Sequence, residues 1–125
     1  MSIKKRAVRV HQMPTVVTES NKSNLLNVLQ MYAENERPRF VLDCSRLWDV
    51  DSSAIGLLLD CLEEVMKYNG DLRLASLCPK AEEALRQAGV TRLFEVYSTT
   101  DSAVQSFHQR AASIAPYAYD VERAA

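Results

Sequence analysis

The chain has little glycine, no long apolar run and almost no net charge. Three glycines in 125 residues are too few for a glycine-rich phosphate loop, and no Gly-x-Ser-x-Gly segment offers a hydrolase nucleophile. No apolar stretch approaches the roughly 20 residues that span a bilayer. The net charge of −1 provides no basic footprint for nucleic acid or for an anionic membrane surface. We therefore expect a soluble, cytoplasmic protein that neither binds nucleic acid nor inserts into a membrane.

The cysteines and histidines do not form a recognisable ligand set. Cys44, Cys61 and Cys78 are widely spaced, with no C-x-x-C pair and no nearby histidine, which argues against a zinc site or a disulfide framework. Their places at expected strand ends and in an apolar helix favour buried thiols. His11 and His108 lie far apart, without a second ligand or base beside either, so we expect ordinary packing or surface roles. We predict no metal and no cofactor.

Strand-like and helix-like segments alternate along the chain. Short runs rich in strand formers predict strands at residues 7–13, 40–44, 72–77 and 93–97. Apolar side chains at helical spacing predict helices at residues 20–35, 52–68, 79–88 and from residue 99 onward. Gly70 is expected to end the second helix in the left-handed conformation. This order predicts a single α/β domain with a mixed central β-sheet, at least partly parallel, and about four α-helices.

The most informative stretch is the junction at residues 51–59, where an apolar strand region leads into an amphipathic helix. Asp51, Ser52 and Ser53 are residue types that cap a helix start, and a cap explains only one of them. The free amides and the dipole of a helix N-terminus favour a negative charge. A serine hydroxyl placed there is therefore a natural position for a phosphoryl group.

Four segments follow one another along the chain: VLDCS at 41–45, VDSSAIG at 50–56, NGDLRL at 69–74 and AGVTRLFEVY at 88–97. Together, and in this order, they resemble the landmarks of STAS domains, especially those of the bacterial anti-sigma-factor antagonists. The pattern departs from the family at Ala54, where a glycine is usual, and at Asp49, where an aromatic is common. The resemblance implies a STAS domain over residues 7–112, between a basic N-terminal tail at 1–6 and a C-terminal tail at 113–125.

The same resemblance implies regulation of transcription through protein partners. The unphosphorylated domain would bind an anti-sigma factor that is also a serine kinase, and so release a sigma factor. The kinase would phosphorylate Ser52, the first serine of the motif, and a metal-dependent serine phosphatase would reverse the reaction. We expect partner contacts from the residues around it, namely Asp51, Ser53, Ala54, Trp48, Asp49 and Gly56.

Two other interpretations compete with this one. An enzyme would use Asp49 and Asp51 as a carboxylate pair or Ser52 as a nucleophile, but no histidine lies near them in sequence, so we predict no catalysis. A STAS subunit of a stress-signalling scaffold or of a lipid-transport ABC complex would bind its partner constitutively. The role of Trp48 stays open between a loop residue packed on the domain and a partner anchor.

Overall fold

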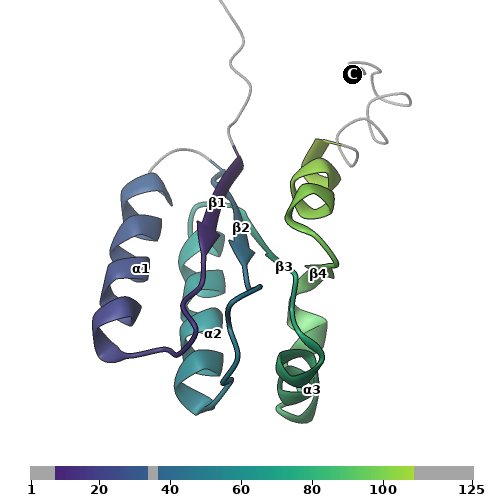
Figure 1. The fold of residues 1–125 in the computed structure, drawn as a ribbon. Coiled ribbons are helices and arrows are strands. Elements are labelled where there is room, and N and C mark those ends of the chain that lie inside the picture. Colours follow the sequence, from purple (N-terminus) through teal and green to yellow (C-terminus); the bar gives the residue numbers. More distant parts are fainter. Residues whose placement is uncertain (1–7, 34–36, 109–125) are drawn as a thin grey trace, which may run out of the picture.

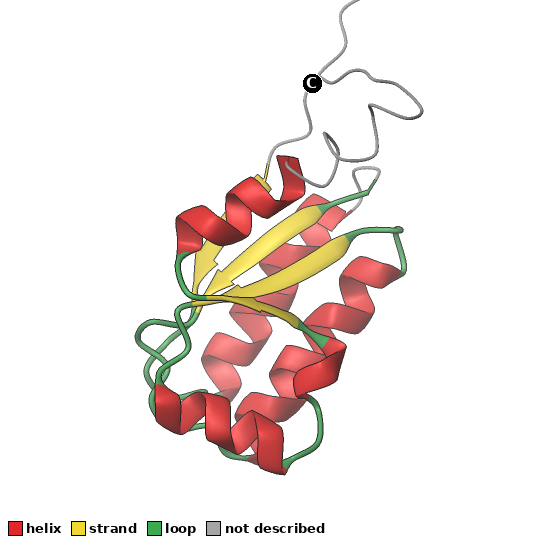
Figure 2. Ribbon diagram, turned by 90° about the vertical axis from the view of Figure 1, so that its right-hand side faces the viewer, coloured by secondary structure: helices red, strands yellow, loops and turns green. Residues whose placement is uncertain are grey.

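A computed structural model describes residues 8–33 and 37–108, which form a four-stranded sheet with helices on both faces (Figures 1 and 2). The tails expected at 1–6 and 113–125, and the expected domain ends at 7 and 109–112, lie outside the described residues.

The elements follow the predicted alternation of strand and helix. They are β1 (Val8–Gln12), α1 (Glu19–Ala33), β2 (Arg39–Asp43), α2 (Ser52–Met66), β3 (Asp71–Ala75), α3 (Pro79–Gln87), the 3-10 turn η1 (Thr91–Leu93), β4 (Glu95–Tyr97) and a last helix at residues 100–108. The α/β class and the four helices are therefore confirmed.

The strands lie side by side in chain order, β1-β2-β3-β4, and every pairing among them is parallel. The sequence led us to expect a mixed sheet, and the described strands show no antiparallel member. Each strand is followed by a helical connection that carries the chain back to the starting edge, so the next strand runs in the same direction. As a result, the loops at residues 13–18, 44–51 and 76–78 meet at the carboxyl edge of the sheet.

The two faces of the sheet are covered differently. On one face the paired residues Phe40 and Leu72, and Leu42 and Leu74, belong to the large core that α1, α2 and α3 complete. On the other face, Val41 belongs to a smaller cluster that the last helix completes. Figure 2 shows this last helix alone on its side of the sheet.

Helix α2 is held firmly along its length. It buries Leu57, Leu58, Cys61 and Val65, at steps of one, three and four residues, against the sheet and α1. Each large apolar side chain buried in this way contributes about 1.5–3 kcal/mol. The packing therefore fixes where the first turn of α2 emerges at the carboxyl edge.

Among the residues that the structure describes, one charged residue is buried: Arg73 of β3, which lies on the smaller face and is 1% exposed. Its guanidinium lies 3.1 Å from Asp71 and 3.5 Å from Glu95, donates a hydrogen bond to Ser106 Oγ, and stacks 3.8 Å from the centre of the Phe107 ring. Because Ser106 and Phe107 belong to the last helix, Arg73 joins that helix to the sheet.

The turn after α2 differs from the prediction. The left-handed residue is Asn69 (φ 60°), so the assignment to Gly70 is wrong. Asparagine tolerates this conformation better than most residues. Gly70 is needed for space instead, because a Cβ there would collide with the carbonyl oxygen of Pro38.

Candidate functional site

Of the three residues that could cap the start of α2, Asp51 does so. Asp51 has extended backbone angles (φ −95°, ψ −173°), and its Oδ1 accepts a hydrogen bond from the Ala54 amide at 2.9 Å. Its carbonyl oxygen accepts the first bond of the helix, from the Ile55 amide, at 3.0 Å. One residue therefore satisfies the cap, through both its side chain and its backbone.

The two serines beside the cap are exposed, and their hydroxyl groups make no hydrogen bond that stabilises the described fold. Ser52 and Ser53 occupy the first two positions of α2, and within the described part of the chain neither hydroxyl has a hydrogen-bond partner. Since Asp51 performs the capping, the Ser52 hydroxyl is available to solvent or to another protein.

The next small residues in α2 differ from each other. Ala54 is fully buried, so its side chain belongs to the core and cannot contact a partner as expected. The methyl group that distinguishes it from the glycine of the family therefore adds nothing to the exposed surface. Gly56 is half-buried, and a Cβ built on it would meet nothing within 4 Å, so the fold itself does not require glycine there.

The loop before α2 exposes Trp48 directly after a residue that is buried in the core. Leu47 is 1% exposed and anchors the loop in the core, whereas Trp48 is 54% exposed. The Lys80 ammonium lies 4.8 Å from the centre of the Trp48 ring and 3.3 Å from Asp49 Oδ1. Packing on the domain thus accounts for only part of the Trp48 surface.

The carboxylates proposed for the enzyme alternative are engaged elsewhere. Asp49 pairs with Lys80, and Asp51 accepts the cap hydrogen bond. In residues 8–33 and 37–108, no group of three or more His, Cys, Asp or Glu residues could hold a metal ion. The expectation that the protein is not an enzyme stays a prediction.

The cysteines and histidines have the environments of packing residues. Burial raises the pKa of both Cys44 and Cys61 to about 12, so they remain protonated thiols. Cys78 is only half-buried, contrary to the expectation for all three cysteines, and its sulfur accepts from the Ala81 amide as the cap of α3. Partial burial lowers the pKa of His11, and His108 is exposed on the last helix.

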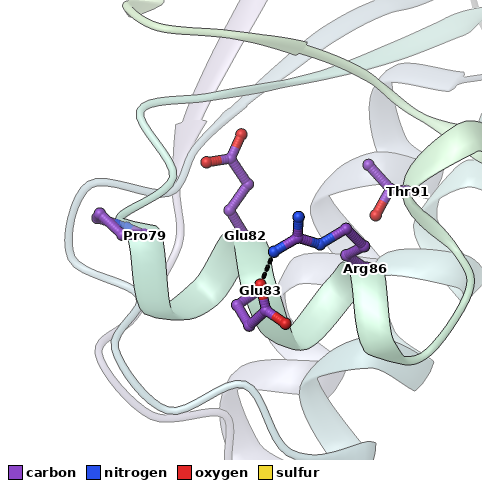
Figure 3. A pocket seen from close by; sticks show the side chains of 5 residues that line it. All are labelled: Pro79, Glu82, Glu83, Arg86 and Thr91. Atoms are coloured by element: carbon purple, nitrogen blue, oxygen red, sulfur yellow. Dashed lines mark ion pairs between the residues drawn. The ribbon is translucent and has the colours of Figure 1, made fainter.

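A shallow groove runs beside α3, at some remove in sequence from the predicted site. It is lined by Pro79, Glu82, Glu83, Arg86 and Thr91, with Arg86 paired to Glu83 (Figure 3). The Thr91 hydroxyl oxygen is buried and has no hydrogen-bond partner among the described residues. None of the residues expected from the sequence to bind a partner lines this groove.

None of the helices in the described ranges has the length and apolar character to cross a membrane.

Solved structures that share this architecture include three proteins. A STAS domain protein from Planctomyces limnophilus, an anti-sigma-factor antagonist by its description, has a TM-score of 0.66 and 20% identity, over 78% of this chain and 87% of that one. A candidate anti-sigma factor antagonist from Thermotoga maritima has a TM-score of 0.66 and 18% identity, over 82% and 90%. A sulfate transporter family protein from Wolinella succinogenes has a TM-score of 0.70 and 20% identity, over 82% and 88%. At these identities the likeness establishes the fold alone.

A search of curated proteins finds no match. The family model described as "STAS domain" matches residues 8–103, which include every strand of the sheet, the capped start of α2 and both exposed serines. With that match over most of its length, the chain belongs to the STAS domain family.

Proposed function

We propose that this chain is an anti-sigma-factor antagonist controlled by phosphorylation of Ser52. Unphosphorylated, it binds an anti-sigma factor that is also a serine kinase, in the bacterial cytoplasm, and so frees a sigma factor for transcription. The kinase phosphorylates Ser52 and ends the interaction, and a serine phosphatase restores it. The observation that carries the proposal is that Ser52 is exposed and its hydroxyl has no hydrogen-bond partner among the described residues, while its neighbour Asp51 caps the helix.

A phosphate on Ser52 would act differently on the domain and on the interface. It adds about −1.5 to −2 charges at neutral pH. The N-terminus of α2 stabilises such a charge, by at most about 2 kcal/mol and usually by less than 1 kcal/mol when exposed. A partner surface that packs against a neutral hydroxyl would have to bury an unpaired charge, which costs several kcal/mol. The modification therefore disfavours binding without disfavouring the fold.

The switch should also leave the domain in place. A shift of α2 would expose buried side chains such as Leu57 and Leu58, each worth about 1.5–3 kcal/mol. This exceeds what an exposed phosphate gains from the helix dipole. We therefore assign the switch to local charge and bulk. The contacts that it controls are the exposed Ser53, Asp51, Asp49 and Trp48 and the half-buried Gly56, with Ala54 left out because it is buried.

Binding to purified anti-sigma-factor serine kinases of the source organism tests the proposal. Calorimetric titration should show that Ser52→Ala binds as the parent does, since it leaves a small neutral surface. Ser52→Asp should bind at least about tenfold more weakly, because it introduces a charge at the contact. Ser53→Asp is the matched control, with the same added charge one residue further along the helix, and its loss should be smaller.

Phosphorylation with ATP and the same kinase provides the second measurement. Peptide mapping should place one phosphate on Ser52. A phosphate on Ser53, Thr99 or Thr100 would overturn the site assignment. A partner that binds the parent and Ser52→Asp equally, with no phosphate transferred, would instead support a constitutive STAS subunit of a signalling scaffold or a lipid-transport complex.

A further inference from the structure

Two exposed apolar side chains lie on neighbouring loops at the carboxyl edge of the sheet. Val16, in the loop between β1 and α1, is 44% exposed, and Trp48, in the loop before α2, is 54% exposed. The Trp48 amide donates to the carbonyl oxygen of Thr15 at 3.2 Å, so the two loops touch beside these side chains. Val16 and Trp48, more than thirty positions apart in sequence, thus lie on touching loops, and we call these two exposed residues the Val16–Trp48 patch.

The first loop is ordered by a compact set of hydrogen bonds. The Asn21 side-chain amide donates to the Val16 carbonyl oxygen at 3.1 Å, and its Oδ1 accepts from the Thr18 amide at 2.7 Å. The Thr18 hydroxyl in turn accepts from the Asn21 amide at 3.3 Å. Val17, next to Val16, is 7% exposed and belongs to the core. Val16 is therefore held outward by its neighbours.

The second loop is ordered as firmly. Buried Leu47 precedes Trp48, and the Leu47 carbonyl oxygen lies 3.7 Å from Cys78 Sγ. Lys80 lies against the indole ring while paired to Asp49. A large apolar side chain that is exposed and already held in place loses little conformational entropy on binding, and tryptophan is enriched among residues that dominate interface energy.

We propose that the Val16–Trp48 patch is an apolar anchor for the anti-sigma factor, which covers this patch and Ser52 together. The inference rests on the proposed function and extends its contact surface to Val16 and Lys80. Lys80 acts as a positioning residue, since it contacts the ring. The partner surface that fits is apolar and receives the valine and the indole.

The patch lies close enough to Ser52 for one partner to cover both. Trp48 and Ser52 are four residues apart, so their Cα atoms are separated by at most about 14 Å. A specific interface of ordinary size covers about 800 Å² on each partner, equivalent to a disc about 32 Å across. A partner seated over Ser52 with such an interface reaches Trp48, and through it the adjoining Val16 loop.

The affinity of the same purified kinase for variants tests the anchor. Trp48→Ala should weaken binding about 10–30-fold and Val16→Ser about 3–10-fold. The matched control is Val10→Ser, at a valine of similar exposure (49%) on β1, which should bind as the parent does. Lys80→Ala should weaken binding a few-fold, and Lys80→Arg should restore it because guanidinium also stacks on aromatic rings. Circular dichroism and urea unfolding of each variant verify the fold.

Fluorescence supplies a direct readout, because Trp48 is the only tryptophan in the chain. The emission of Trp48 should move to shorter wavelength when the partner buries the indole. The spectrum of the partner mixed with Trp48→Phe is subtracted first, because it contains the emission of the partner's own tryptophans.

The outcomes distinguish failure of the anchor from failure of the proposed function. If Ser52→Asp weakens binding while Trp48→Ala and Val16→Ser bind as the parent does, the anchor is wrong and the function stands. If no such kinase binds the parent chain, both fall. Sedimentation of the chain alone tests whether a second copy occupies the patch instead. A dimer that dissociates in the Trp48→Ala and Val16→Ser variants would mean that it does.

Discussion

Replacing Asp51 by alanine separates the residue that holds α2 from the residue that we propose to be the switch. The substitution removes the hydrogen bond of 2.9 Å to the Ala54 amide and a negative charge at the helix N-terminus. Replacing an N-cap residue by alanine costs about 0.5–2 kcal/mol, and for an aspartate the lost charge accounts for about 0.3–1 kcal/mol of this cost. We expect Asp51→Ala to lower the free energy of unfolding by about 1–2 kcal/mol.

Two companion variants divide this cost. Asp51→Asn keeps an equally good capping group and loses only the charge, so it should cost about 0.3–1 kcal/mol. Ser52→Ala removes a hydroxyl with no partner in the described structure and replaces it by a better helix former, so stability should stay equal or rise slightly. For a domain of this size, thermal unfolding should place Asp51→Ala about 4–8 °C below the parent.

The assay is calorimetric unfolding of the four proteins at one pH and one salt concentration, supported by urea titration. A loss of stability in Ser52→Ala equal to that in Asp51→Ala would contradict this prediction, because Ser52 would then be part of the cap and not free. An unchanged stability of Asp51→Ala would contradict it equally, because the cap bond would then contribute nothing.

Three further predictions concern other residues. Gly56→Ala should stabilise the domain by about 0.5–1 kcal/mol while weakening partner binding, whereas Gly70→Ala should destabilise it by about 1–3 kcal/mol through collision with Pro38; urea unfolding compares the two. In the native protein a thiol reagent should modify Cys78 first, and the other two thiols only on unfolding, because burial raises the pKa of both to about 12; mass spectrometry locates the label. Arg73→Ala should cost about 2–4 kcal/mol in urea unfolding, because it removes the ion pairs and the ring contact of a buried side chain; no loss would mean that the last helix packs without it.

Much of the fold was readable from the sequence because its signals are local. The steps of three and four in α2, the cap residue Asp51 and the proline that opens α3 each act within one turn of helix. The predicted elements accordingly match the observed ones to within a few residues. The three candidates for the cap of α2, Asp51, Ser52 and Ser53, could also be named from the sequence, and the structure shows that Asp51 is the one that performs it.

The features that were not predicted depend on contacts between distant segments. Arg73 reads in sequence as an ordinary strand residue, and only the last helix, some thirty residues later, makes it buried. Position 70 requires glycine because a Cβ there would collide with Pro38, which directly precedes the neighbouring strand β2. Its own backbone angles do not require glycine. Val16 and Lys80 are near Trp48 only because parallel strands bring their loops to one edge.

The agreement between strand order and chain order has a consequence for synthesis on the ribosome. Each new strand joins the edge left by the one before it, so the sheet can lengthen in the direction of translation without opening any pair already formed. The residues at 100–108 emerge after all four strands, and until they arrive the guanidinium of Arg73 stays hydrated. Docking of this helix on the nascent domain therefore removes water from a single guanidinium. A chain halted before that point would expose a charged, hydrated sheet face that the last helix covers in the finished protein.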